Sequence, residues 1–301
     1  FVQIVQGEAV AVLDFIDEWL ATKDIKPKTI DTYRASLRKV ADQFPYTHSI
    51  DRRAVKNWIL ELQVEENLNR NTIQRMLSVA GSYWEYLDQK GRIASGKNPF
   101  KNALSSQKQK TKGKKSPKRQ PFDPRDIPRL VVKAREKDDN LLADLILLGA
   151  WTGCRIEEIC SLKLKDVKAD RLIIVDAKTS AGNRIVPIHV KLHSTVERLR
   201  ASSEDGSLLS GLTFNKYGDR SNAIGKRFGS LKSDLGFGPE LVYHSIRKTV
   251  ATLLENAGVS ENVASDLLGH EKQTMTYGLY SSGANFETSR GALARLDYDG
   301  L

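Results

Sequence analysis

Hydrophobic residues recur at helical spacing through the first hundred residues of the chain, where they predict four helices. The apolar positions of these helices are Val12, Ile16, Trp19 and Leu20; Tyr33, Leu37, Val40 and Phe44; Val55, Ile59 and Leu62; and Ile73, Leu77, Ala80, Trp84 and Leu87. Pro27 can begin the second helix, Asp51 can cap the third, and Gly91 can end the fourth. The pattern therefore predicts a compact helical domain over residues 1–100.

A second predicted domain, residues 121–301, begins where Asp123 can cap a helix that has Pro124 at its first position. The leucine-rich run 141–150 predicts a buried helix, and residues 171–188 contain two β-branched runs around a Gly-Asn turn, which is typical of a hairpin. From Ser221 onward the pattern predicts another helix. Its expected inward residues are Ile224, Phe228 and Leu231, and its expected outward residues are Arg220, Lys226, Arg227 and Lys232. The chain is thus expected to be mainly α with a small β-hairpin, an α+β arrangement in the second domain.

Residues 242–281 place several chemically active side chains close together. Apolar spacing predicts one helix that ends near Gly258, and this helix puts His244 and Arg247 on one face, where both can reach the same ligand. A second helix, capped by Ser260, is expected to end just before His270. Each of these residues alone is common on protein surfaces, so the indication of a site rests on their combination.

Composition points to a nucleic acid as the partner. The chain has 301 residues, 40% of them hydrophobic, with a net charge of +10 and a pI near 9.4. This basic balance favours a polyanion, and the apolar content excludes a disordered protein. No run approaches the roughly 18 apolar residues of a membrane helix, and the first residues lack the pattern of a signal peptide, so a cytoplasmic protein without a membrane partner is expected. The two cysteines, Cys154 and Cys160, are expected to be reduced core residues.

A basic segment joins the two predicted domains. Residues 101–119 contain eight lysines and arginines and no acidic residue, so they cannot bury a core and are interpreted as a linker over residues 101–120. Such a segment can lie along DNA phosphates, or it can be a solvated tether, and its composition alone allows both.

Four motifs resemble those of the tyrosine recombinases, the phage-integrase family. They are T-G-C-R-I-E-E-I-C-S-L at 152–162, H-S-I-R-K-T at 244–249, L-L-G-H at 267–270 and Y-G-L-Y-S at 277–281. The resemblance implies a helical core-type DNA-binding domain followed by a catalytic domain. It also implies a site-specific recombinase that cleaves and rejoins DNA through a 3′-phosphotyrosine intermediate and integrates or excises a mobile element such as a prophage or genomic island.

The resemblance also assigns the catalytic residues. They are Arg155, Lys178, His244, Arg247, His270 and Tyr280, with Glu158 bracing the site. Arginine presents a planar fork that fits two phosphate oxygens, lysine can protonate the leaving 5′-oxygen, and tyrosine is the nucleophile. Tyr277 is the alternative nucleophile, because it lies seven residues after His270 and Tyr280 lies ten. No cofactor and no metal ion are implied.

The family resemblance implies double-stranded attachment sites as partners and a homo-tetramer on DNA, and it allows an accessory DNA-bending or directionality factor. Two other functions remain open: a type IB topoisomerase-like strand transferase, and a non-catalytic DNA-binding regulator of the same fold. The tail after Tyr280 can dock on a neighbouring protomer or on its own domain.

Overall fold

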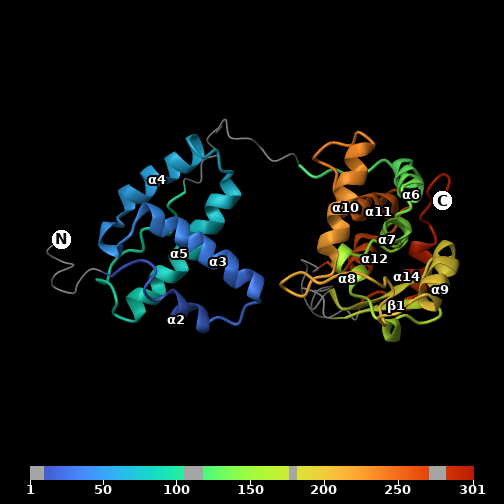
Figure 1. The fold of residues 1–301 in the computed structure, drawn as a ribbon, viewed down its shortest axis with the longest axis horizontal. Coiled ribbons are helices and arrows are strands. Elements are labelled where there is room, and N and C mark those ends of the chain that lie inside the picture. The colour runs from blue at the N-terminus through green and yellow to red at the C-terminus, as the bar shows by residue number, and fades with distance from the viewer. Residues whose placement is uncertain (1–9, 105–117, 176–181, 271–282) are drawn as a thin grey trace. The chain divides into compact units, whose positions relative to one another are not determined.

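The computed structural model describes residues 10–104, 118–175, 182–270 and 283–301. The chain divides into two compact units, unit 1 (Phe1–Ser116) and unit 2 (Pro117–Leu301), drawn in Figure 1. Among the described residues both units are mainly helical, and the two paired strands belong to unit 2. The mainly α fold with a small β-hairpin is confirmed.

Unit 1 is a helical bundle around an aromatic core. Its elements are α2 (Ile16–Ala21), α3 (Pro27–Gln43), the 3-10 helix η1 (Thr47–Ser49), α4 (Arg52–Val64) and α5 (Arg70–Gln89). The Asp51 carboxylate accepts a hydrogen bond from the backbone N–H of Ala54 at 2.7 Å and caps α4, as the sequence predicts. Trp19 stacks on Tyr33 with 5.6 Å between ring centroids. Every apolar position predicted for these helices is buried or packs against this core.

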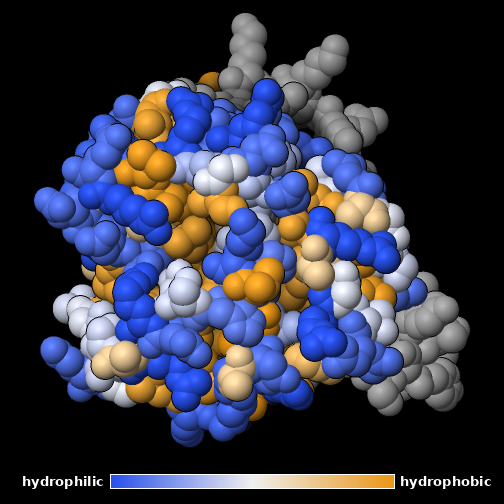
Figure 2. Space-filling model, turned by 90° about the vertical axis from the view of Figure 1, so that its right-hand side faces the viewer, coloured by the Kyte–Doolittle hydropathy of each residue, from blue (hydrophilic) through white to orange (hydrophobic). Residues whose placement is uncertain are grey.

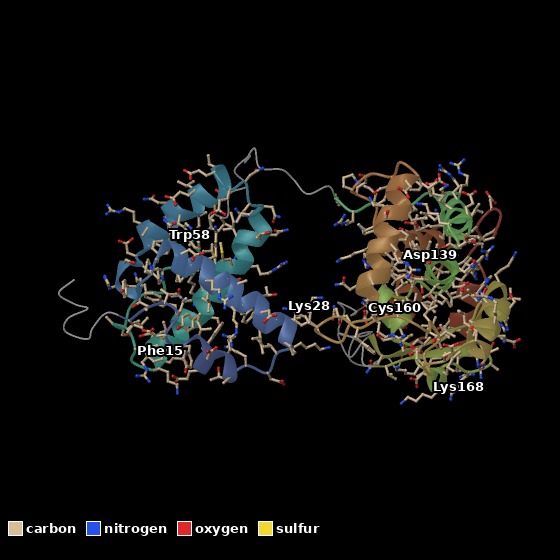
Figure 3. All side chains as sticks on the ribbon, in the orientation of Figure 1. Phe15, Lys28, Trp58, Asp139, Cys160 and Lys168 are labelled. Atoms are coloured by element: carbon tan, nitrogen blue, oxygen red, sulfur yellow. The ribbon has the colours of Figure 1, made fainter. Side chains whose placement is uncertain are left out.

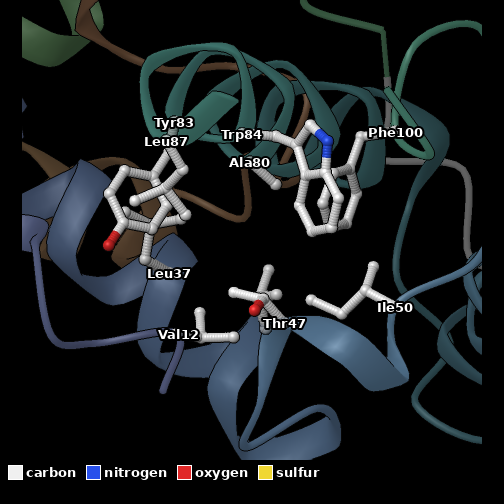
Figure 4. A pocket seen from close by; sticks show the side chains of 10 residues that line it. Val12, Leu37, Thr47, Ile50, Ala80, Tyr83, Trp84, Leu87 and Phe100 are labelled. Atoms are coloured by element: carbon white, nitrogen blue, oxygen red, sulfur yellow. The ribbon is translucent and has the colours of Figure 1, made fainter. Parts of the chain in front are cut away.

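A small apolar pocket lies inside unit 1, between α3, α5 and the segment around η1 (Figure 4). It is lined by Val12, Leu37, Val40, Thr47, Ile50, Ala80, Tyr83, Trp84, Leu87 and Phe100. These are the core side chains themselves, so we interpret the pocket as a packing gap of the bundle.

The described residues at the two ends of the predicted linker pack on different units. Leu104 is buried in the core of unit 1, and the Arg52 guanidinium holds the same stretch through a 2.6 Å hydrogen bond to Asn102 O. At the other end, the N–H of Gln120 donates to Glu240 O at 3.2 Å within unit 2. The linker boundaries at 101 and 120 stay a prediction.

Unit 2 is built around α7, whose length is almost entirely buried. The helices of unit 2 are α6 (Asp126–Glu136), α7 (Asn140–Thr152), α8 (Ile156–Cys160), α9 (His193–Ala201), α10 (Ser221–Asp234), α11 (Tyr243–Asn256), α12 (Glu261–Leu268) and α14 (Phe286–Leu293), with 3-10 helices η2 (Leu164–Asp166) and η4 (Val190–Leu192). In Figure 1, α7 and α11 lie in the middle of the unit. They approach closely because Gly149 has no side chain: a Cβ there would lie 2.4 Å from the Tyr243 hydroxyl.

The hairpin of unit 2 pairs β1 (Arg171–Ile174) with β2 (Arg184–Pro187) in antiparallel register. Ile174 is opposite Arg184, so residues 175–183 connect the strands. The predicted hairpin is present, but Gly182–Asn183 precedes β2 and does not form a two-residue turn by itself. Two β-branched runs indicate the strands well, whereas the turn position depends on pairing that composition does not specify.

Two other local predictions differ from the structure. Helix α6 begins at Asp126, and the Asp123 carboxylate accepts from the N–H of Arg125 and pairs with its guanidinium instead of capping a helix at Pro124. Arg220 and Lys232, expected to face outward beside α10, are buried. Arg220 pairs with Asp205, and Lys232 donates to the carbonyl of Gly238 at 2.5 Å. Helical periodicity does not reveal these partners, because they come from other segments.

The described part of the C-terminal tail packs on its own unit. Helix α14 contacts α12 and β2, and the buried hydroxyl of Tyr298 donates to Ala150 O at 2.8 Å. Leu293 and Leu296 are buried in the same core. In this single chain the described part of the tail, residues 283–301, therefore packs intramolecularly.

The surface of unit 2 is mixed in polarity. Figure 2 shows hydrophilic and hydrophobic residues intermingled on the face turned to the viewer. Lys168, labelled in Figure 3, is one of the exposed residues of this unit.

The two cysteines of unit 2 are buried and free. Cys160 is labelled on α8 in Figure 3, and Cys154 lies just before the same helix, so the expectation of reduced core residues is confirmed for both. No helix among the described residues is long and apolar enough to span a membrane.

Candidate active site

Three arginines converge on the C-terminal end of α12. Gly269 adopts the left-handed conformation (φ 62°) and ends the helix, which leaves the last carbonyls without intrahelical partners. Each accepts a hydrogen bond from a different arginine: Leu267 O from Arg184 Nε at 2.7 Å, Leu268 O from Arg247 Nη2, and Gly269 O from Arg155 Nη2 at 2.9 Å. The negative end of a helix dipole favours cations. The end of α12 therefore gathers three guanidinium groups next to His270.

Arg247 extends from α11 into the centre of this cluster and is only 3% exposed. Its Nη1 donates to Gly153 O at 2.8 Å, and its Nε is buried with no hydrogen-bond partner among the described residues. Burial, followed by the charges of Arg155 and Arg184, lowers the pKa of Arg247 to about 10. An unpaired buried N–H costs about 1–3 kcal/mol, so an anionic oxygen that reached this group would be bound favourably.

Arg155 stands immediately before α8 and is held by Glu158. Its Nη1 donates to Glu158 Oε1 at 2.6 Å, and its backbone N–H donates to Glu158 Oε2 at 2.8 Å. The Arg155 side chain is 33% exposed and the Glu158 side chain 7%. Burial acts to raise the pKa of Glu158, but the hydrogen bonds and charges of Arg184 and Arg155 outweigh it and lower the pKa. Glu158 is therefore a fixed carboxylate beneath a partly accessible guanidinium.

His244 and His270 lie beside the arginines. His244 is on α11, three residues before Arg247, and His270 follows Gly269, with its backbone N–H donating to Ser265 O at 2.9 Å. Both histidines are exposed at the surface, yet desolvation by the surrounding side chains, followed by the charge of Arg247, lowers the pKa of both imidazoles, that of His270 to about 4. Both rings are therefore neutral at pH 7 and can each accept or donate a hydrogen bond.

Arg184, the first residue of β2, belongs to the cluster but was not predicted as a site residue. Its side chain is 6% exposed and pairs with Glu158 at 3.0 Å. A sequence signal was available: side chains alternate along a strand, so Arg184 shares the inward face with buried Val186, whereas Ile185 is exposed. An arginine on the buried face of a strand needs a partner, and this one has Glu158.

The structure thus brings together Arg155, His244, Arg247 and His270 of the six predicted catalytic residues. Lys178, Tyr280 and the alternative Tyr277 lie outside the described residues. Within the described ranges, no group of three or more His, Cys, Asp or Glu side chains is arranged to hold a metal ion. The arrangement is chemically suited to an anion that needs several charge-assisted hydrogen bonds, such as a phosphate diester.

Two protein-family models match this chain, one in each unit. A family model described as the phage integrase family matches residues 121–285, and one described as the phage integrase N-terminal SAM-like domain matches residues 13–91. The chain is 23% identical over 277 residues to tyrosine recombinase XerA of Pyrococcus horikoshii, an alignment that covers 90% of each protein.

Two solved structures show the shared fold. A lambda integrase tetramer bound to a Holliday junction matches with a TM-score of 0.70 and 18% identity, over 91% of this chain and 81% of the other. The Tn1549 transposon integrase in complex with transposon right end DNA matches with a TM-score of 0.68 and 21% identity, over 95% and 99% of the two chains.

Proposed function

Since the chain belongs to the phage integrase family, as a tyrosine-type site-specific recombinase, we propose that it cleaves and rejoins DNA strands through a 3′-phosphotyrosine intermediate. The observation that supports this chemistry is the cluster at the end of α12. Arg155 and Arg247 are held in place by backbone carbonyls, so they do not have to reorganise when an anion arrives. A phosphodiester gains negative charge on its nonbridging oxygens during attack, and these two guanidinium groups meet that charge.

The proposed reaction has balanced proton transfers. The Tyr280 hydroxyl attacks the phosphorus, its proton passes to neutral His244, and the bond from phosphorus to the 5′-oxygen breaks while Lys178 protonates that oxygen. The products are a 3′-phosphotyrosine and a free 5′-hydroxyl. His270 donates a hydrogen bond to a phosphate oxygen. A strand is rejoined when a 5′-hydroxyl attacks the phosphotyrosine in the reverse sense, and no ATP is needed because one phosphoester replaces another.

Double-stranded DNA with a specific recombination site is the proposed substrate, and a homo-tetramer the proposed active assembly. The net charge of +10 supports the first proposal, and the similar lambda integrase tetramer on a Holliday junction supports both. We propose integration or excision of a mobile element such as a prophage or genomic island, in line with the similarity to a transposon integrase. The relative XerA is named a tyrosine recombinase with no mention of a mobile element, so recombination at another kind of DNA site is the second candidate.

A nicked suicide substrate tests the reaction and the nucleophile together. The nick lets the short 5′-hydroxyl fragment diffuse away, so the covalent protein–DNA adduct accumulates. Tyr280→Phe removes only the hydroxyl and is expected to bind DNA without forming the adduct, whereas Tyr277→Phe is expected to form it. The opposite pattern would assign the nucleophile to Tyr277. If the unaltered protein forms no covalent adduct with any fragment of genomic DNA, the proposed reaction is refuted.

A further inference from the structure

We propose that Arg184 is a positioning residue: it fixes the Glu158 carboxylate, and through Glu158 it holds Arg155 in the orientation that meets the scissile phosphate. This role rests on the proposed phosphoryl transfer. It differs from the roles of Arg155 and Arg247, because Arg184 does not itself contact the substrate.

The two oxygens of Glu158 are each shared between Arg184 and Arg155. Oε1 accepts from Arg155 Nη1 at 2.6 Å and from Arg184 Nη1 at 3.3 Å. Oε2 accepts from the backbone N–H of Arg155 at 2.8 Å and from Arg184 Nη2 at 3.0 Å. Each oxygen of the carboxylate is thus held by both arginines, so a change in the position of Arg184 must move Glu158 or leave part of a buried carboxylate unpaired.

Arg184 has no hydrogen-bond donor left for a substrate. A guanidinium has five N–H groups, and five contacts account for them. Besides the two to Glu158, Nε donates to Leu267 O at 2.7 Å, Nη1 to Gly182 O at 2.8 Å, and Nη2 to Cys154 Sγ at 3.4 Å. With its side chain 6% exposed, Arg184 connects the start of β2, the end of α12 and the segment before Arg155.

A charge alone cannot replace this geometry. Lysine has one ammonium with three donors and no planar fork, so it can pair with one oxygen of Glu158 but cannot also reach Leu267 O, Gly182 O and Cys154 in fixed directions. Loss of the fork would allow Glu158 and Arg155 to reorient together. Misplacement of a catalytic group by about 1 Å can lower a rate about 10²-fold.

The test compares Arg184→Lys with Arg171→Lys, a matched control on the other strand of the same hairpin. Arg171 pairs with Asp170 and its side chain is 34% exposed, and none of its described contacts involves the arginine cluster. Single-turnover cleavage of the suicide substrate at saturating protein is expected to fall about 10²-fold for Arg184→Lys, with DNA affinity within about twofold of the unaltered protein. Arg171→Lys is expected to stay within about threefold in both measurements.

A second substrate distinguishes misplacement of the Arg155 guanidinium from a general loss of active-site structure. Replacing one nonbridging oxygen of the scissile phosphate with methyl gives a neutral methylphosphonate, on which correct guanidinium placement has less effect. The defect of Arg184→Lys is expected to shrink at least about tenfold on this substrate, because the lost interaction is with phosphate charge. Equal slowing on both substrates, or unaltered cleavage of the ordinary one, would overturn the proposal.

A double variant tests whether Arg184 acts through Glu158. In a Glu158→Gln background, Arg184→Lys is expected to add less than about threefold, because the relay through the carboxylate is already broken; a further loss of about 10²-fold would show that Arg184 acts by another route. If Arg184→Lys fails to fold, Glu158→Gln takes its place in the two-substrate comparison, with the same outcomes decisive. The unaltered protein must form the adduct first: if it does not, the proposed function fails, whereas rapid cleavage by Arg184→Lys refutes only this inference.

Discussion

Replacing Gly153 with alanine adds one methyl group at the point where α7 meets α12. Gly153 has a φ of +64°, and a Cβ there would lie 2.5 Å from Leu268 Cδ2 and 3.1 Å from Val250 Cγ1. The left-handed conformation costs a non-glycine residue roughly 1–2 kcal/mol, and overpacking a core costs about 1–3 kcal/mol. Leu268 and Val250 are both buried, so neither can move freely. Gly153→Ala is expected to lower the free energy of unfolding of unit 2 by about 2–5 kcal/mol.

Gly258→Ala is the matched control, because Gly258 has a φ of +72° but a Cβ added there would have no atom within 4 Å. It should lose only the backbone contribution, roughly 1–2 kcal/mol. Pulse proteolysis of the full chain in a urea series, with fragments of the two units separated by size, gives the unfolding midpoint of unit 2. Equal destabilisation by the two variants would refute the packing argument.

The same substitution has a functional consequence. Gly153 O accepts a hydrogen bond from Arg247 Nη1 at 2.8 Å, so a methyl group that displaces this backbone also displaces the guanidinium. Among molecules that remain folded, Gly153→Ala is expected to slow adduct formation, and Gly258→Ala is not. A Gly153→Ala protein that is destabilised but cleaves at the normal rate would show that Arg247 does not depend on this carbonyl.

Three further outcomes are expected. Cleavage should continue in excess EDTA, because guanidinium and ammonium groups supply the positive charge that metal ions supply in other phosphoryl transfers; loss of cleavage that magnesium restores would contradict this. Replacing Lys108, Lys110, Lys112, Lys114 and Lys115 with glutamine should flatten the log-log salt dependence of DNA binding, and an unchanged slope would show that these lysines do not contact phosphates. The pKa of His270 is about 4 in the folded protein and about 6.5 when unfolded, so between these values the unfolded chain binds the extra proton and stability falls as pH falls. His270→Gln should therefore lose less stability than the unaltered protein between about pH 7 and about pH 4, measured by urea unfolding, and parallel losses would contradict the lowered pKa.

Local signals in the sequence predicted the helices of unit 1 and both helices that flank Gly258. Asp51 and Ser260 cap helices in the structure as expected, because an N-cap depends on residues only three positions away. Arg220 shows the limit of such reasoning. It was placed on an outer face, yet Asp205 and the carbonyl of Leu209 enclose it from a separate loop. A periodic pattern specifies which face a side chain occupies and not what lies against that face.

The candidate site shows the same division between motif and geometry. The motif resemblance identified Arg155 and Arg247 as site residues. They lie together because each donates a hydrogen bond to a backbone carbonyl at the end of α12, which is remote from both in sequence. Arg184 is the third member of this set: alternation along the strand places it on the inward face, but its partners Leu267 O and Glu158 come from α12 and α8 and are seen only in the structure. The described part of the site holds these three guanidinium groups against the carboxylate of Glu158, with both imidazoles neutral at pH 7. A net charge near +2 therefore remains where a phosphodiester of charge −1 would bind, and the excess matches the further negative charge that develops on the phosphate during attack.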